Sequence, residues 1–188
     1  MSVTKWVLSL VLTVPVFAAP EHYTVDPEHT YPSLEMPHMG LSIWRGKFNH
    51  TTGTITFDPV AKTGSVDIRV DAASIDFGHD KMNEFALGAD WLDVAKFPTM
   101  TYGGVLQFDD AEPVAVDGQL TLRGVTRPVT LKINSFTCIE KHPFMQKKVC
   151  GADAEADLDR AEFGMTQYTE GGAGKIHLRI QIEGMRSD

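Results

Sequence analysis

The chain has 188 residues, and its 25 acidic residues outnumber its 17 lysines and arginines to give a net charge of −8. This balance argues against binding to nucleic acid or to anionic membrane surfaces, both of which recruit cationic patches. The length suits one domain with a substantial core.

The first 18 residues have the pattern of a secretory signal peptide. Lys5 supplies a positive charge, residues 6–17 form an apolar run, and Ala18 provides a small residue at the exit. The run is shorter than the roughly 20 residues that a membrane-spanning helix needs. We therefore expect cleavage after Ala18, a single mature domain over residues 19–188, a periplasmic location and no stable insertion into a membrane.

Most of the remaining chain alternates apolar and polar residues, which is the pattern of half-buried antiparallel strands. The clearest runs are residues 54–58, 66–71, 100–108, 114–122, 129–134 and 176–183. In the fourth run, for example, Val114, Val116, Leu120 and Leu122 share one face. Strands at this density, each with one apolar face, predict a sandwich or a barrel.

One segment departs from this alternation. Met82, Phe85 and Ala86 lie at helical spacing, and Gly88 can end a helix, so the sequence predicts a short helix over residues 79–88. Residues 90–93 favour a further helical turn.

Two turn signals fall between alternating runs. Residues 123–126, Arg-Gly-Val-Thr, predict a hairpin, because alternating runs flank them on both sides. Asp117 and Gly118 resemble a hairpin corner as well, but the alternation continues through them. Gly118 therefore marks either a β-bulge or the start of a strand.

The two cysteines, Cys138 and Cys150, favour a structural disulfide. A cysteine pair in an exported protein usually forms one. A pair of metal ligands and a redox-active pair are the alternatives, although the sequence has no C-x-x-C spacing.

Motifs for catalysis or metal binding are absent from the sequence. The seven histidines show no H-x-H or H-x-x-x-H spacing, and the chain has no G-x-S-x-G nucleophile motif and no phosphate-binding glycine loop. We accordingly expect no catalytic residue, no metal site and no cofactor.

Large apolar side chains gather in two stretches, residues 36–48 and residues 82–92. Methionine and aromatic side chains adapt well to irregular apolar ligands. The same residues would also suit an ordinary core, and the pattern alone leaves both interpretations open.

Six sequence blocks, in order along the chain, resemble those of YceI-like domains. Residues 23–30 resemble the family's "D-x-x-H-S" opening, residues 118–129 its "G-x-L-T-I-x-G-V-T-K-P-V" strand pair, and residues 159–165 its "R-x-x-F-G-M" segment. The other three are residues 38–48, 72–76 and 97–99. Residues 85–91 depart from the family's "H-L-R-S" run, as do Tyr31 and Pro32 after the opening histidine.

The resemblance implies an all-β fold, an extended eight-stranded antiparallel lipocalin-like barrel with one or two short helices. It also implies an internal apolar channel for a long-chain lipid, such as a polyisoprenoid, an isoprenoid quinone or a fatty amide, no catalytic residues, and compatibility with a homodimer. The ligand-binding residues that we expect are Met36, Met39, Ile43, Phe48, Met82, Phe85, Trp91, Met100, Tyr102, Leu122, Phe163 and Met165. For the ligand's head group we expect Arg45, Lys81 and Asn83.

Two other functions stay open at this point. One is a stress-protective periplasmic protein with a filled core and no native ligand. The other is an enzyme or redox helper that acts on a quinone or a prenyl diphosphate.

Overall fold

The computed structural model describes residues 19–187, so the expected signal peptide lies outside the described residues. Eleven strands and one α-helix, α1 (Asp80–Leu87), make up most of this part. The strands are β1 (Glu21–Val25), β2 (Tyr31–His38), β3 (Ser42–Phe48), β4 (Thr51–Asp58), β5 (Thr63–Asp71), β6 (Ile75–Asp76), β7 (Thr99–Asp109), β8 (Glu112–Leu122), β9 (Val125–Ile139), β10 (Val149–Asp159) and β11 (Lys175–Arg186). Short 3₁₀ helices span Ala72–Ser74, Arg160–Phe163 and Glu170–Gly172.

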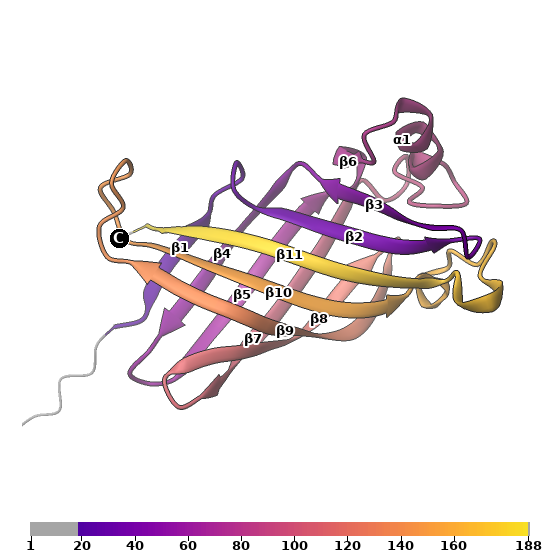
Figure 1. The fold of residues 1–188 in the computed structure, drawn as a ribbon. Helices are drawn as coiled ribbons and strands as arrows, with labels where there is room; N and C mark the ends of the chain where they lie inside the picture. The colour runs from indigo at the N-terminus through magenta and orange to yellow at the C-terminus, as the bar shows by residue number, and fades with distance from the viewer. Residues whose placement is uncertain (1–18, 188) are drawn as a thin grey trace, which may run out of the picture.

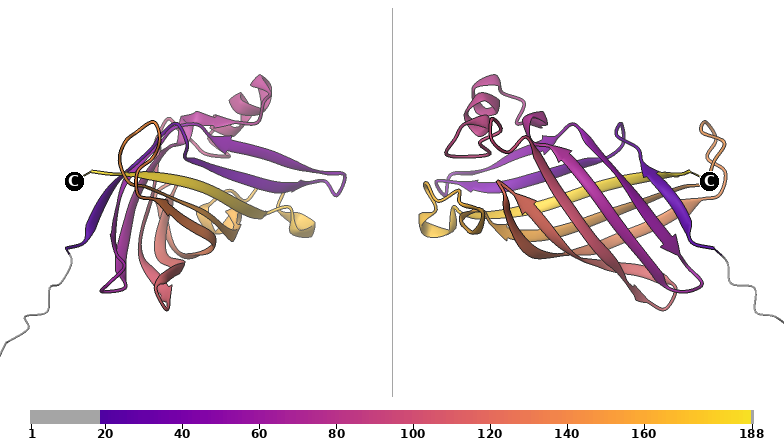
Figure 2. Two further views of the ribbon diagram at one scale, coloured as in Figure 1. Left: turned by 60° about the vertical axis from the view of Figure 1, so that its left-hand side comes forward. Right: turned by 180° about the vertical axis from the view of Figure 1, so that it is seen from behind.

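All strand pairs are antiparallel, and eight strands close into a ring in the order β1-β4-β5-β7-β8-β9-β10-β11, with β11 pairing back to β1 (Figure 1). The strands β2, β3 and β6 lie past bends in the chain and continue β1, β4 and β5. For example, β2 continues β1, because β11 pairs with both of them. The predicted all-β, eight-stranded antiparallel barrel is therefore confirmed. Seen from behind, β4, β5 and β7 cross steeply over β10 and β11 of the opposite wall (Figure 2).

The two ends of the barrel differ. One end carries α1, the tip of the β2–β3 hairpin and the loop before β11, whereas the other carries the C-terminal end of β11 and the loop between β9 and β10 (Figure 1). The helix α1 matches the expected helix, but residues 89–92 form turns instead of a further helical turn. The segment between α1 and β7 therefore covers its end of the barrel as an irregular chain.

The bend between β1 and β2 is held by a group of polar side chains. Asp26 accepts hydrogen bonds from the Glu28 N–H through Oδ1 and bonds to His29 Nδ1 through Oδ2, at 2.9 and 2.8 Å. The Asp26 N–H donates to the carbonyl of Glu183 on β11, and the Thr30 hydroxyl accepts from the Glu183 N–H. The first sequence block thus ties the bend to the last strand.

The hairpin between β8 and β9 confirms one predicted turn. Arg123 and Gly124 have φ values of 52° and 72°. A two-residue type I′ hairpin requires positive φ at two consecutive residues. Gly124 adopts a positive φ readily because it has no Cβ atom.

The bulge in β8 lies at Val114 and not at Gly118. Gln107 pairs with Ala115 but Phe108 pairs with Pro113, so Val114 is the extra residue, and its side chain is exposed. Gly118 pairs regularly with Gly104 inside the strand. The prediction that Val114 shares a face with Val116 is wrong. The extra residue interrupts the in–out alternation of side chains between the two positions.

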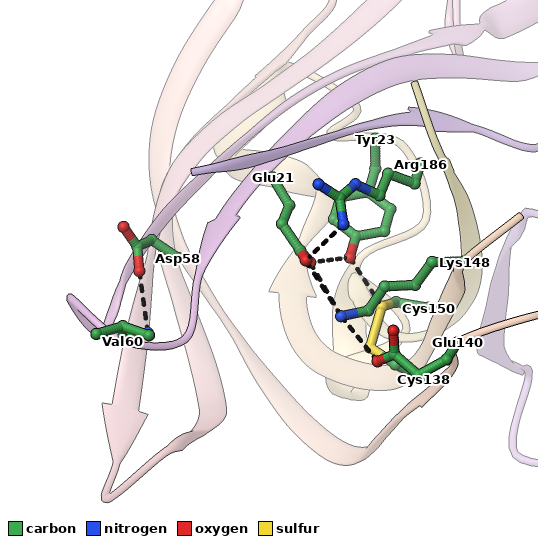
Figure 3. Close-up of polar contacts among 9 residues, drawn as sticks. All are labelled: Glu21, Tyr23, Asp58, Val60, Cys138, Glu140, Lys148, Cys150 and Arg186. Carbon is green, nitrogen blue, oxygen red and sulfur yellow. Dashed lines mark hydrogen bonds and ion pairs between the residues drawn. A yellow bond between two sulfur atoms is a disulfide. The ribbon is translucent and has the colours of Figure 1, made fainter. Parts of the chain in front are cut away.

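The predicted disulfide is confirmed and joins Cys138 and Cys150, which lie directly opposite each other on β9 and β10. Beside it, at the end of the barrel away from α1, Glu21 receives hydrogen bonds or ion pairs from Tyr23, Lys148 and Arg186 (Figure 3). Burial, with the hydrogen bond to Glu21, raises the pKa of Tyr23. This polar cluster links β1, β10 and β11 where the barrel closes.

Candidate binding site

An apolar cavity of about 120 Å³ lies inside the barrel at the end that carries α1, and we call it the inner cavity. Leu34 and Met36 of β2, Leu122 of β8 and Ile176 of β11 line it, with residues of β3, β6, β7 and β10. The only polar groups among its lining side chains are the indole N–H of Trp91 and the guanidinium group of Arg160.

The size of the inner cavity sets what it holds in this conformation. It is close to an engineered cavity of about 150 Å³ that takes up benzene and stays free of water. One small apolar group therefore has room, and a longer chain requires lining side chains to move. Met36, Met100 and Met165 are suited to such movement, because methionine is unbranched and flexible.

A second hollow of about 730 Å³ lies beside α1, and we call it the outer hollow. It is lined mainly by α1 and the residues that follow it, including Lys81, Met82, Phe85 and Trp91, with Trp44 of β3. Because Trp91 lines both spaces, this side chain forms part of the wall between the inner cavity and the outer hollow.

The position of Trp91 depends on Arg123 in the β8–β9 hairpin. The guanidinium group of Arg123 donates to the carbonyl of Trp91 through Nη1 and to that of Ala89 through Nη2 at 3.1 Å. The indole ring contacts Phe85 at 5.2 Å between ring centroids. The turn that carries Trp91 is thus attached to the barrel rim.

Arg160 follows β10 and is 3% exposed. Its Nη1 donates to the Met165 carbonyl at 2.6 Å, and its Nη2 donates to the carbonyls of Gln167 and Tyr168 at 2.6 and 3.0 Å. Its guanidinium carbon lies 4.6 Å from the centroid of the Trp91 ring. Burial lowers the pKa of Arg160, but an arginine stays protonated at neutral pH.

Two buried donors at this contact have no hydrogen-bond partner in the part of the chain that the structure describes. They are Nε of Arg160 and Nε1 of Trp91. A buried donor without an acceptor costs about 1–3 kcal/mol, and more when it is charged. Both residues line the inner cavity through other atoms, and neither of these two nitrogens reaches its surface.

The residues predicted to bind ligand fall into four groups. The inner cavity is lined by Met36, Phe48, Trp91, Met100, Leu122 and Met165. The outer hollow is lined by Met82 and Phe85, with Trp91 again. Tyr102 and Phe163 are buried in the core outside both spaces, whereas Met39 and Ile43 are exposed on the β2–β3 hairpin.

The three head-group candidates lie apart. Lys81 lines the outer hollow. Arg45 pairs with Glu35 at 3.1 Å on the exposed surface of β2 and β3. Asn83 accepts the Phe77 N–H at 2.7 Å and so fixes the turn before α1.

Several lining residues were not among the predicted site residues, and Arg160 is the most informative of them. It stands in the "R-x-x-F-G-M" block, so a signal was present, but nothing in the sequence distinguishes a buried arginine from a solvated one. The others are apolar and come mainly from strands: Pro32, Leu34, Ile75, Phe77, Ala86, Leu92, Leu120, Leu158, Ile176 and Leu178.

A group with metal-ligand chemistry lies outside the cavity, at the bend between β1 and β2. Ligand atoms of Asp26, His29 and Glu183 lie within 4.8 Å of one another. Hydrogen bonds from Glu28 and His29 already occupy both carboxylate oxygens of Asp26. We therefore assign this group the structural role described above.

Comparison with known proteins places this architecture in a family. The family model described as YceI-like domain matches residues 23–184. Protein YceI from Salmonella arizonae is 29% identical over 181 residues, which cover 95% of this chain and 93% of that protein. Within the described residues, no helix has the length and apolar character needed to cross a membrane.

Solved structures share the fold. BcnA from Burkholderia cenocepacia superposes with a TM-score of 0.68 at 21% identity, over 85% of this chain and 98% of that one. A polyisoprenoid binding domain from Saccharophagus degradans, implicated in plant cell wall breakdown, superposes with a TM-score of 0.63 at 13% identity, over 87% and 98%. Because the family model matches most of the length of this chain, the chain belongs to the family of YceI-like domains.

Proposed function

We propose that this protein is a periplasmic binding protein that holds a long-chain apolar ligand in the barrel interior and catalyses no reaction. The ligand classes that suit it are polyisoprenoids, isoprenoid quinones and fatty amides. The observation that carries the proposal is the inner cavity, whose lining is apolar except at Arg160 and Trp91.

Burial of hydrocarbon supplies enough free energy for such binding. Each CH₂ group moved from water into an apolar site contributes about 0.8 kcal/mol. Association and ordering of the chain cost on the order of 4–15 kcal/mol. A chain of tens of carbons exceeds this cost if most of it is buried, so the apolar lining alone accounts for affinity.

The outer hollow supports a route of entry. A long chain does not fit the inner cavity as it stands, and Trp91 forms part of the wall between the two spaces. Movement of α1 and the turn that carries Trp91 would join them into one channel. The adaptable side chains of Met82 and Phe85 line the outer part of that channel.

The N-terminal pattern of residues 1–18 supports the proposed location, and the disulfide is compatible with it. Disulfides persist in oxidising compartments such as the bacterial periplasm. The fold of a polyisoprenoid binding domain in another organism supports the ligand class but does not identify the ligand.

The test is native mass spectrometry of the protein purified from its own periplasm, followed by organic extraction. We expect a stoichiometric long-chain species, released by solvent, and a protein mass that begins at residue 19. A mass equal to the protein alone, together with an empty extract and no uptake of added apolar chains, would overturn the proposal in favour of a filled barrel. A mass that retains residues 1–18 in a cytoplasmic fraction would overturn the location.

A further inference from the structure

The helix α1 and the chain that follows it fold together at one end of the barrel (Figure 1). The N–H of Leu92 donates to the carbonyl of Ala86 at 3.0 Å. In the same way, the N–H of Val94 donates to the carbonyl of Leu87 at 3.2 Å. These bonds fold the chain back onto the last turn of the helix. Residues 80–97 therefore form one body, which we call the lid.

The lid forms one wall of the inner cavity. Ala86, Trp91 and Leu92 all line this cavity, and Trp91 also borders the outer hollow. The lid thus stands between the space that is suited to an apolar chain and the space by which such a chain would arrive.

Both ends of the lid are fixed to neighbouring parts of the chain. At its start, the side chain of Asn83 accepts the Phe77 N–H at 2.7 Å. Beyond its end, the Pro98 carbonyl accepts the Ala72 N–H at 2.9 Å. Gly78 has a φ of 70° and no atom within 4 Å of the place that a Cβ would occupy, so the backbone can pivot there. The lid can therefore turn about its ends without leaving the barrel.

The middle of the lid is attached to the barrel by Arg123 of the β8–β9 hairpin. Its guanidinium group donates through Nη1 to the carbonyl of Trp91 and through Nη2 to that of Ala89, the latter at 3.1 Å. Among the described residues, these are the hydrogen bonds that join residues 88–97 to the strands and hairpins of the barrel. Both acceptors are backbone groups, so the attachment depends on the guanidinium and not on the side chains of the lid.

We infer that residues 80–97 swing outward when an apolar chain enters or leaves, and that Arg123 is the latch that holds them closed. The inference rests on the proposed function and specifies how its site opens. Arg123 lines neither the inner cavity nor the outer hollow, so it contacts no ligand in either space. It is a positioning residue, and its hydrogen bonds act on the barrier to exchange of the ligand.

The variant Arg123→Asn removes the latch and keeps the turn. Arg123 has a φ of 52°, and Asn-Gly is a preferred pair for a type I′ hairpin, so the hairpin should still form. Loss of the guanidinium group raises the free energy of the closed lid in the empty and the loaded protein alike. We therefore expect the association and dissociation rate constants both to rise about tenfold, as loss of one hydrogen bond from a charged donor provides, while Kd changes by less than about twofold.

Stopped-flow fluorescence with diphenylhexatriene, a neutral apolar probe, measures both rate constants on the full, delipidated protein. Association is followed on mixing. Dissociation is followed as transfer of the probe to phosphatidylcholine vesicles that carry an energy-transfer acceptor. The matched control is Arg127→Gln, which removes the same charge from an exposed position of β9, where Arg127 donates to the Thr126 carbonyl. It should exchange the probe at wild-type rates.

The outcomes separate this inference from the proposed function. Unchanged rate constants in Arg123→Asn, or an equal acceleration in Arg127→Gln, overturn the latch while binding of apolar chains stands. Faster dissociation with unchanged association would mean that Arg123 stabilises the loaded protein and not the closed lid, and this also overturns the latch. Failure of the wild-type protein to take up the probe overturns the proposed function itself, and the lid with it.

Discussion

The ring of Tyr102 occupies the space beside Gly118, so that a Cβ atom at position 118 would lie 2.4 Å from Cζ of the tyrosine. The tyrosine hydroxyl lies 2.9 Å from the carbonyl oxygens of both Val116 and Val129. A single side chain from β7 therefore lies over Gly118 and contacts the backbone of the next two strands, β8 and β9. It fills the barrel next to the inner cavity, and it explains why the alternation of β8 continues through a glycine.

Replacement of Gly118 by alanine should lower the free energy of unfolding by about 1–3 kcal/mol, because a methyl group there forces the Tyr102 ring to shift within a packed core. Urea unfolding measures the change. The control is Gly103→Ala in β7, where the nearest atom to an added Cβ is the Val66 carbonyl oxygen at 3.9 Å. An equal loss of unfolding free energy in both variants would show that the destabilisation comes from replacing any strand glycine and not from the contact with Tyr102.

Filling the inner cavity should weaken ligand binding without unfolding the protein. Leu122→Phe adds volume to the cavity lining, and we expect an affinity for apolar chains at least about tenfold lower, equivalent to roughly 1.4 kcal/mol. Dye displacement measures the affinity and circular dichroism checks the fold. Val105→Phe adds the same ring to an exposed position of β7 and should bind as the wild type does. Unchanged affinity in a folded Leu122→Phe protein would place the ligand elsewhere.

Removal of the disulfide should affect stability and leave binding intact. The cysteines are 12 residues apart in sequence, and a closed loop of about that length stabilises a fold by roughly 3 kcal/mol. The double variant Cys138→Ala, Cys150→Ala should lose about this amount in denaturant unfolding. Neither cysteine lines the inner cavity, so the affinity for apolar chains should be unchanged. A reductant should destabilise the wild type and have no effect on the variant, and any loss of affinity would contradict the separation of these two regions.

The pair of Asp26 and His29 predicts a pH-dependent contribution to stability. The hydrogen bond to Asp26 and its charge raise the pKa of His29 above 6.5. A raised folded-state pKa means that this contribution is fully present below the unfolded-state value of about 6.5 and is lost as the pH rises through the folded-state value. For Asp26, burial opposes ionisation, but the hydrogen bonds from His29 and the Glu28 N–H together lower its pKa below 3.8. Its contribution is present above that value and is lost as the pH falls through the folded-state pKa.

The variant His29→Gln should therefore be less stable than the wild type between about pH 5 and pH 6, with the difference shrinking at higher pH. Thermal unfolding midpoints over a pH series measure it. His22→Gln, at an exposed position of β1, is the control. A difference between wild type and His29→Gln that stays constant from acidic to alkaline pH would mean that the imidazole charge contributes nothing to the bend.

The strands and the tight hairpin could be predicted from the sequence because they depend on local chemistry. The alternation in residues 176–183 and the Arg123–Gly124 turn required no tertiary information. β10 gives a weaker signal, since its inner face is largely alanine: Ala154 and Ala156 alternate there with acidic residues. The misplaced Val114 shows the limit of periodicity, because one bulged residue reverses every assignment on one side of it.

The candidate site was less predictable because it depends on contacts between distant segments. Met39 and Ile43 have the composition of a cavity lining, but they lie on an exposed hairpin tip. Arg160 has the composition of a surface residue, but the carbonyls of residues 165–168 and the Trp91 ring surround it. Only the fold decides which apolar side chains enclose a space and which charged one borders it.

The pairing of β1 with β11 affects how the barrel forms. The hydroxyls of Thr24 and Ser187 lie 2.8 Å apart although 163 residues separate them in sequence. Contacts of such high sequence separation incur their loop-closure entropy before they contribute stability, and they slow folding. We therefore expect the seam between β1 and β11 to form late, so that the apolar interior stays open on that side until β11 docks between β10 and β1.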